Sequence, residues 1–262
     1  MAELATINPL YTLSGFVVGL LVGLTGVGGG SLMTPLLVLL FGIHPSIAVG
    51  TDLLYAAVTK SVGTAVHGAN RSVEWRVVGR LAAGSAPTTI ATGLLLYWLG
   101  AGGDGSHRLM SFVLGIAVLI TAALLLGRSW ILAYFGSRLS PGGPRHAGGL
   151  TILTGAVLGV LVTLSSVGAG ALGVTALFLL YPRMPIARIV GSDIAHAVPL
   201  TLLAGAMHWL IGSVDWHLLL SLLTGSIPGI IVGSMLAVRV PDRVIRPMLA
   251  CVLLLVGGRL VF

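Results

Sequence analysis

The chain has 262 residues, of which 56% are hydrophobic and only 8% are charged, a balance that excludes a water-soluble domain of this size. Its formal net charge of +7 comes from Lys and Arg residues in short connections between apolar stretches, where they orient a membrane protein, so nucleic acid is not an expected partner. The single cysteine, Cys251, permits neither an internal disulfide nor a cysteine metal site.

The first half of the chain predicts five helical pieces, in the order 10–26, 31–43, 46–69, 76–99 and 107–127. Most of these pieces are close in length to the roughly 20 apolar residues that a membrane-spanning helix needs. The second piece would be only about 20 Å long, so the first two are expected to be short or to form a re-entrant hairpin. The start of the chain lacks a basic leader, so no cleaved signal peptide is expected.

A glycine-rich interruption separates the first two pieces. Backbone outside a helix is tolerated at membrane depth where it lines a cavity, and the helix that follows presents free N–H groups and a positive dipole end that attract anions. The segment is therefore a candidate anion site, although glycines also serve close packing. Its candidate residues are Thr25, Gly26, Val27, Gly28, Gly29, Gly30 and Ser31.

The third piece carries three ionisable residues at membrane depth, where such groups are candidates for function. Lys60, the only lysine, lies at the expected depth of the glycine-rich tip and is a candidate anion ligand. Asp52 would relay protons or anchor the tip through hydrogen bonds. His67 would titrate near neutral pH or cap the helix end.

The second half repeats the first, with an offset of 140 that becomes 141 after one inserted residue. Gly50, Asp52, His67, Trp75 and Pro87 fall on Gly191, Asp193, His208, Trp216 and Pro228. Asp193 and His208 are thus candidates for the same roles as Asp52 and His67. The counterpart of the glycine-rich tip adds the candidate anion ligands Ser165, Ser166, Val167, Gly168 and Gly170.

Basic residues in short loops favour the cytoplasm, and they predict opposite orientations for the two repeats. In the first repeat they cluster between the third and fourth pieces, whereas in the second they follow the fourth. We therefore expect an all-α polytopic membrane protein with two inverted-topology repeats, residues 1–127 and 149–262, and about 8 to 10 membrane segments. A basic cytoplasmic linker, 128–148, would join them, and the N-terminus would lie outside the cell.

The segment Gly23 to Leu53, GLTGVGGGSLMTPLLVLLFGIHPSIAVGTDL, resembles the TauE/SafE family of sulfite and organosulfur anion exporters. The second copy is similar to that family's diverged second half, with Ser166 and Thr175 where the first copy has Gly26 and Pro35. The resemblance implies transport of sulfite, sulfoacetate, thiosulfate or a related anion across a prokaryotic inner membrane, without nucleotide or cofactor.

The sequence thus predicts a secondary transporter of a small anion that works by alternating access around a midplane site between the two tips. Two alternatives remain open, a proton-coupled metal or cation transporter that uses the Asp and His pairs, and a passive anion channel. An enzyme is not expected, because the chain has neither a His-Glu-x-x-His pair nor a recognisable nucleophile constellation.

Overall fold

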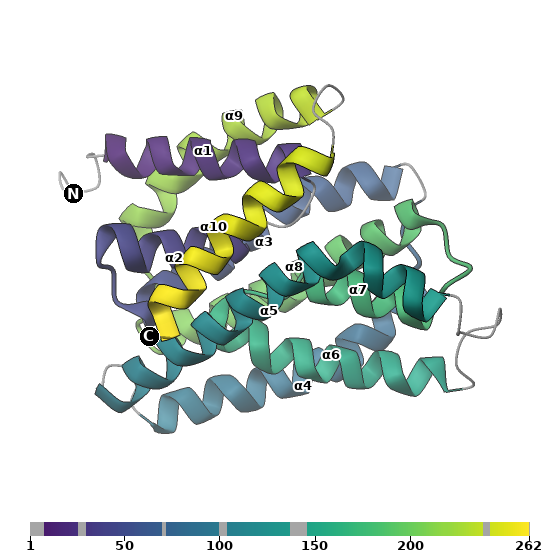
Figure 1. The fold of residues 1–262 in the computed structure, drawn as a ribbon. Coiled ribbons are helices and arrows are strands. Elements are labelled where there is room, and N and C mark those ends of the chain that lie inside the picture. The colour runs from purple at the N-terminus through teal and green to yellow at the C-terminus, as the bar shows by residue number, and fades with distance from the viewer. Residues whose placement is uncertain are drawn as a thin grey trace.

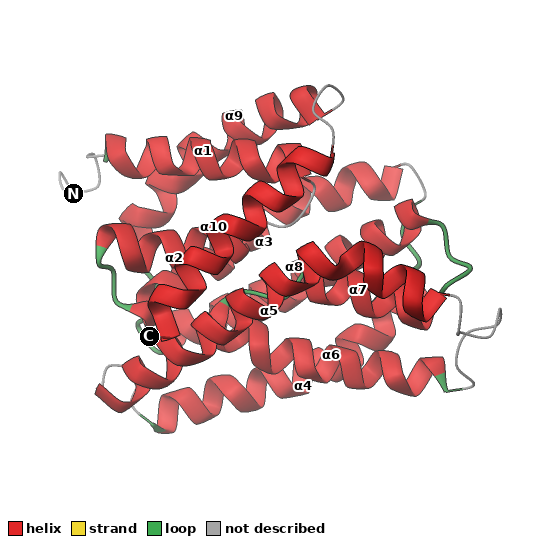
Figure 2. Cartoon of the chain, in the orientation of Figure 1, coloured by secondary structure: helices red, strands yellow, loops and turns green. Residues whose placement is uncertain are grey.

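The computed structural model describes residues 8–25, 30–69, 72–99, 104–136, 146–237 and 242–261, and over these ranges the chain is helical with short connections (Figure 2). The first repeat contains α1 (Pro9–Thr25), α2 (Gly30–Phe41), α3 (Pro45–Ala69), α4 (Trp75–Trp98) and α5 (Asp104–Gly136). The second contains α6 (Ala147–Ser165), α7 (Ala171–Leu180), α8 (Ile186–Leu210), α9 (Trp216–Ala237) and α10 (Asp242–Val261). The expected helical pieces are therefore present, and α5 continues through residues 128–136 of the expected linker.

Helix lengths and composition indicate a bilayer as the solvent. Within the described residues, four stretches are long and apolar enough to cross a membrane, Met110–Gly127, Ala147–Ser165, Ile186–Leu210 and Trp216–Gly233. Helices α2 and α7 have only 12 and 10 residues. At 1.5 Å per residue they reach roughly 18 and 15 Å, which is less than the roughly 30 Å hydrocarbon core.

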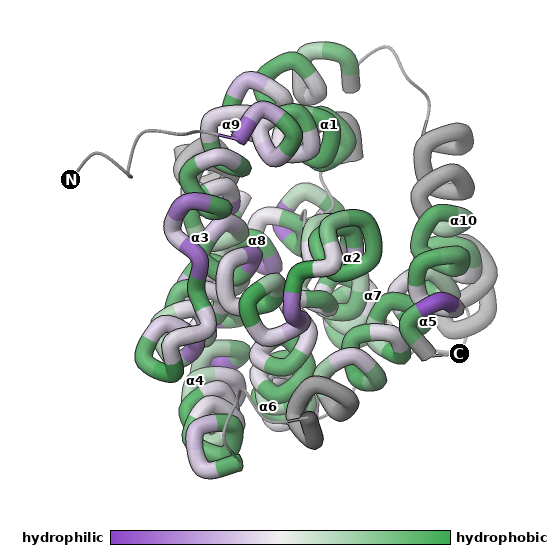
Figure 3. The backbone as a smooth tube through the Cα atoms, turned by 90° about the vertical axis from the view of Figure 1, so that its left-hand side faces the viewer, coloured by the Kyte–Doolittle hydropathy of each residue, from purple (hydrophilic) through white to green (hydrophobic). Residues whose placement is uncertain are grey.

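Many large apolar side chains are exposed on the outer surface, and several polar and charged side chains are buried. Trp98, Leu40 and Leu255 are among many large hydrophobic residues left exposed, whereas Asp52 and Asp193 are buried. Figure 3 shows hydrophobic colour over most of the helices, with hydrophilic colour confined to short segments, several of them along α3. This distribution fits a protein whose outer surface faces lipid and whose interior holds the functional polar groups.

The helices of the two repeats pack against each other. Helix α1 lies beside α9 at one edge of the molecule, and α4 lies beside α6 at the opposite edge (Figure 1). Both pairs depend on glycine, because a Cβ on Gly15 would overlap the carbonyl oxygen of Leu222, and a Cβ on Gly155 would overlap that of Leu81. In the repeat alignment, Gly15 corresponds to Gly155 and Leu81 to Leu222. The two contacts are therefore equivalent, but the glycine comes from the first repeat in one contact and from the second repeat in the other.

Helices α3 and α8 occupy the middle of the fold and run antiparallel. Gly50, near the start of α3, packs on His208 near the end of α8, and Leu54 packs on Gly205. Near its amino end, each of these two helices also binds the connection that precedes the fourth helix of the other repeat. The N–H of Glu74 donates to Ser192 Oγ over 2.8 Å, and the N–H of Asp215 donates to Thr51 Oγ1 over 3.1 Å.

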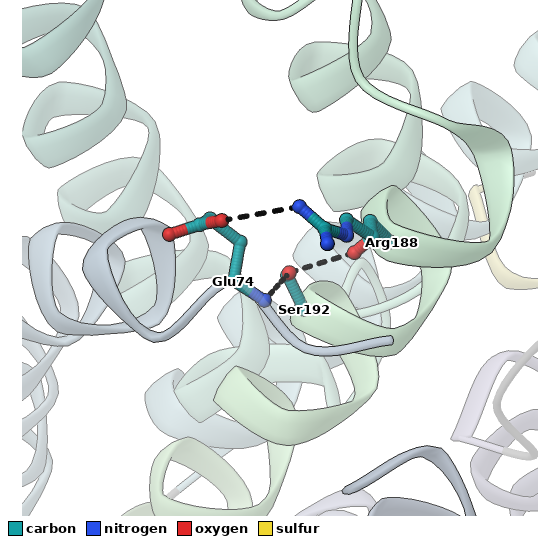
Figure 4. A network of polar contacts seen from close by, with 3 residues as sticks. All are labelled: Glu74, Arg188 and Ser192. Carbon is teal, nitrogen blue, oxygen red and sulfur yellow. Dashed lines mark hydrogen bonds and ion pairs between the residues drawn. The ribbon is translucent and has the colours of Figure 1, made fainter. Parts of the chain in front are cut away.

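The connection between α3 and α4 makes one further contact with α8. Arg188 Nη1 lies 3.8 Å from Glu74 Oε2, next to the hydrogen bond between Glu74 and Ser192 (Figure 4). Both side chains of this ion pair are partly exposed, so it contributes little to stability. The hydroxyl of Ser192, which is buried and immediately precedes Asp193, is the stronger link between the connection and α8.

Candidate functional site

The turn between α6 and α7 is an interruption of helix inside the protein. Ser166 adopts the left-handed conformation with φ 56°, and Gly168 and Gly170 have φ of 119° and 132°. These values are costly for residues with a Cβ, which explains the two glycines in the turn. Helix α7 then begins at Ala171, directly after this turn, so its first N–H groups lie at the turn.

The two serines of this turn have different roles. Ser165 Oγ donates to Leu161 O over 2.6 Å and accepts the N–H of Val167 over 3.2 Å, so this hydroxyl stabilises the turn itself. Ser166 Oγ is buried, lies next to the Asp52 carboxylate and makes no hydrogen bond of standard geometry with the described residues. Of the predicted serine ligands in the second tip, Ser166 is therefore the one whose hydroxyl does not stabilise the turn.

The first tip lies largely outside the described residues. Gly26, Val27, Gly28 and Gly29 are not described, and Thr25, Gly30 and Ser31 are placed only as the ends of α1 and α2. What the structure does describe on this side is Thr34 of α2, whose hydroxyl donates to Asp52 Oδ2 over 2.5 Å. Asp52 on α3 is thereby attached to the short helix that follows the first tip.

Lys60 joins α3 to the second tip. Its side chain is 92% buried, and Nζ donates to the carbonyl oxygen of Ala169 over 3.2 Å. An ammonium has three N–H donors, and no other acceptor among the described residues binds this one. Two donors of a buried positive charge are thus available beside a break in the helix.

Two carboxylates lie near this ammonium. Asp52 and Asp193 both interact electrostatically with Lys60, and the Ser166 side chain lies next to the Asp52 carboxylate. Asp193 packs on α7, where a Cβ on Gly173 would overlap its Oδ1 atom. The structure therefore brings Asp52, Lys60, Ser166 and Asp193 from α3, α8 and the second tip into one buried cluster.

Several polar atoms of this cluster have no hydrogen-bond partner. Asp52 Oδ1, Asp193 Oδ1 and Ser166 Oγ are all buried and unpaired in the described part of the chain, as is Nδ1 of His196. Buried polar atoms are nearly always paired, since leaving one unpaired costs roughly 1–3 kcal/mol. Their concentration around Lys60 marks this region as the place where a small polar ligand, water or protons bind.

The histidines have separate surroundings. His208 Nε2 lies 2.9 Å from the carbonyl oxygen of Thr163, so this residue ties α8 to the end of α6. His196 Nε2 lies 2.9 Å from Ser85 Oγ. Its repeat equivalent is Tyr55, which donates to Ser226 Oγ over 2.7 Å. The side chain of His67 lies outside the described residues.

Sequence reasoning did not assign several groups that contribute to this cluster. Thr34, Gly173 and the carbonyl oxygen of Ala169 contact the candidate residues, and Tyr55 and Ser85 support them. The repeat alignment contains a signal for Ser85 and Tyr55, because an offset of 141 places them on Ser226 and His196. Among the described residues, no group of three or more His, Cys, Asp or Glu is placed to hold a metal ion.

Comparison with known proteins gives consistent matches over the whole chain. A family model described as sulfite exporter TauE/SafE matches residues 11–260. The probable membrane transporter protein YjnA of Bacillus subtilis is 40% identical over 95% of this chain and 98% of its own length. A probable membrane transporter protein of Xylella fastidiosa is 28% identical over 86% of this chain and 83% of that protein. No solved structure gives a significant match.

Proposed function

The chain belongs to the TauE/SafE family and is a multi-pass membrane transporter, and on this premise we propose that it is a secondary transporter of a small anion. The anion is sulfite or a related sulfur-containing anion such as sulfoacetate or thiosulfate. It binds between the two helix tips, to Lys60, Ser166 and the backbone of the tips, without a cofactor or nucleotide. The choice of sulfur depends on the family description alone.

The observation that carries the proposal is the buried ammonium of Lys60 at the second tip. A charged side chain at this depth is costly even beside carboxylates, so it is retained where it has a function. Its bond to Ala169 O fixes it beside the amino end of α7, whose first N–H groups also favour negative charge. A compact oxyanion can accept hydrogen bonds from both groups at once.

The reciprocal contacts between repeats support an inverted-topology architecture. Equivalent residues exchange partners in the α1–α9 and α4–α6 pairs, and the equivalent helices α3 and α8 run antiparallel. A two-fold axis in the plane of the membrane would produce both the exchanged contacts and the antiparallel helices. Transporters with such an axis bind their substrate near the midplane of the membrane. The proposed orientation in a prokaryotic inner membrane places the N-terminus outside and the linker 128–148 in the cytoplasm.

The test is flux of radiolabelled sulfite into proteoliposomes that contain the purified protein, with sulfate, thiosulfate and sulfoacetate as competitors. Protein-free liposomes give the background. Saturable flux that the sulfur-containing anions inhibit is the expected result. Flux that rises linearly with concentration would instead support a passive channel, and an absence of flux with folded protein in both gradient directions would contradict the proposal.

A proton-coupled cation transporter is the second candidate, and the two buried carboxylates are the observation in its favour. Lys60 places a positive charge beside both of them, which disfavours a second cation at the same position. Uptake of a divalent metal ion that Asp52→Asn and Asp193→Asn both abolish, in protein that carries no anion, would favour this candidate.

A further inference from the structure

Each of the two short helices already has a carboxylate against its amino-terminal half. Helix α2 begins at Gly30 and contacts Asp52, and helix α7 begins at Ala171 and contacts Asp193. Asp52 and Asp193 are equivalent residues of the two repeats. The arrangement is therefore present twice, once in each repeat, which a chance contact would not reproduce.

The contacts of Asp52 are those of a bound anion. Its Oδ2 atom accepts the Thr34 hydroxyl over 2.5 Å, and the main-chain N–H of Thr34 also faces the carboxylate. The side chain of Ser166, in the second tip, also interacts with this carboxylate. A hydroxyl, an N–H group near a helix amino end and a nearby ammonium are the groups that would hold a free oxyanion in this place.

Asp193 has the corresponding position on α7. Gly173 is the third residue of that helix, and the approach of Asp193 Oδ1 leaves no room for a Cβ there. The close contact brings the carboxylate against the first turn of α7. The Gly173 N–H donates to Gly168 O over 3.4 Å, and among the described residues Asp193 Oδ1 has no hydrogen-bond partner, so the interaction with the helix end is electrostatic. Negative charge is stabilised at this end by the helix dipole.

The formal charges show why a free anion cannot simply be added. Lys60 contributes +1, and the two ionised carboxylates contribute −1 each, so the cluster carries −1. A monovalent anion would make it −2 in a buried place, where each unpaired charge costs several kcal/mol. With both carboxyl groups protonated, Lys60 and a monovalent anion sum to zero.

Other titratable groups near the two carboxylates do not change this sum. Tyr55 lies near Asp52, and His196 and His208 on α8 are held by Ser85 and Thr163 O. Among the helices packed on α3 and α8, the sequences of α2, α6 and α7 contain no titratable residue. The remainder lie toward helix ends, namely His67 on α3, Arg188 on α8, His217 on α9, Arg76, Arg80 and Tyr97 on α4, and Asp104, His107, Arg108, Arg128 and Tyr134 on α5.

We infer that Asp52 and Asp193 are resident anions, which occupy the binding groups of the two short helices until protonation releases them to the transported anion. Each carboxylate takes one proton from water, its neutral carboxyl group leaves the helix end, and the anion replaces it beside Lys60. When the anion departs, each carboxyl returns its proton. This coupling rests on the proposed function, and it makes the protein a proton–anion symporter.

Proton uptake on binding tests the inference directly. We would titrate purified protein with sulfite by calorimetry in two buffers of different ionisation enthalpy, because the difference gives the protons taken up per anion. Sulfite itself exchanges protons near neutral pH. Wild type is therefore compared with the double variant Asp52→Asn/Asp193→Asn, because the protons exchanged by sulfite contribute equally in both proteins. The matched control is Asp215→Asn, the same change at an exposed aspartate outside the cluster.

Wild type and the control should take up about one to two protons more per anion than the double variant. Where the wild-type carboxyls are ionised, the double variant should bind sulfite at least as tightly as wild type, because its amides mimic the protonated carboxyls. Equal uptake in all three proteins, or loss of binding in a folded double variant, would overturn the inference and leave anion transport intact. No binding to wild type would overturn both proposals.

If the double variant does not fold, as judged by size-exclusion chromatography, wild type alone decides. After correction for the ionisation of sulfite, its affinity should fall by up to about tenfold per pH unit for each coupled proton as the carboxyls ionise. A corrected affinity that stays constant between about pH 5 and pH 9 would overturn the inference.

Discussion

At the scale of single residues, the duplicated scaffold carries an asymmetric site. The two aspartates are equivalent, but the position of Lys60 is taken by Thr201 in the second repeat. The Thr201 hydroxyl donates to Ala197 O four residues earlier, which is a local bond within its own helix. One cation therefore serves two carboxylates, and the ammonium of Lys60 donates to Ala169 O of the second tip.

We predict that Lys60→Met weakens sulfite binding by about 10- to 100-fold, because it removes charge-assisted hydrogen bonds worth roughly 1.5–3 kcal/mol while keeping an unbranched side chain of similar length. The change is measured as the dissociation constant of the purified protein. Thr201→Val is the matched control, since it alters the equivalent position of α8 and should leave the constant within about twofold of wild type.

The two variants separate a specific role of Lys60 from a general effect on the helix pair. If Lys60→Met binds sulfite as well as wild type, the ammonium is not a ligand. If Thr201→Val is as impaired as Lys60→Met, the loss reflects packing between α3 and α8 rather than charge.

At the scale of helices, close packing between the repeats depends on small residues at particular positions. The α4–α6 pair brings Gly84 so near to α6 that a Cβ would overlap Ile152 O, whereas Gly79 on the same helix faces open space. Its counterpart in the α1–α9 pair is Gly225, which lies against Thr12 O. Glycines of α1 have the same packing role, because Gly15 and Gly19 both lie against α9.

We predict that Gly84→Ala lowers stability by about 1–3 kcal/mol, because the added methyl forces α4 and α6 apart. The effect should appear as a fall of several degrees in the apparent melting temperature in detergent, followed by tryptophan fluorescence. Gly79→Ala, which adds the same methyl to α4 where nothing lies within 4 Å, should leave the melting temperature unchanged or raise it slightly. Equal melting temperatures for both variants would contradict the packing argument.

Helix positions were predictable from the sequence, but helix partners were not. Uncharged stretches and interruptions gave all five pieces of the first repeat, to within three residues except at the end of α5, which continues to Gly136. Apolar patterning says that α1 packs against something, yet it does not say that the partner is α9. The repeat alignment identified Asp52 and Asp193, but the acceptor of Lys60 is a main-chain carbonyl, which has no signature in side-chain pattern.

At the scale of the whole molecule, packing divides the protein differently from the sequence. Helices α1, α2, α3, α9 and α10 form one connected group and α4 to α8 form a second, and α3 and α10 each also share their largest interface with a helix of the second group, α8 and α5 respectively. Exchanging the repeats converts each group into the other. The α3–α8 and α5–α10 contacts are the main links between the groups, and Figure 1 shows α10 converging on α5 toward the C-terminus.

This division places the candidate site on the boundary between the two groups. Asp52 and Thr34 belong to the first group, and Asp193 and Gly173 belong to the second. Lys60 crosses the boundary, because it extends from α3 to Ala169 between α6 and α7. Alternating access would then move these two groups past each other, rather than the two sequence repeats, with the anion and Lys60 between them.

We predict that a disulfide between the groups stops transport and that one within a group does not. A Cβ on Gly257 of α10 would lie 2.8 Å from Leu119 Cγ of α5, so Gly257→Cys/Leu119→Cys can form a bridge across the boundary. Gly93→Cys/Met207→Cys joins α4 to α8 within the second group, where the corresponding Cβ lies 2.8 Å from Met207 Cβ, so the two helices must separate by about 1 Å to form the bridge. Both pairs are made with Cys251→Ser, because the native thiol is exposed.

Sulfite flux is measured after oxidation and again after reduction. Because the boundary pair fixes α5 to α10, oxidation should abolish its flux and reduction should restore it, whereas the pair within the second group should transport in both states. Reversible loss of flux in both pairs would mean that α4 and α8 also move relative to each other, so that the moving unit is smaller than the group. Unimpaired flux in the oxidised boundary pair would mean that α5 and α10 stay fixed, and the motion would then be confined to the tips and the central α3–α8 contact.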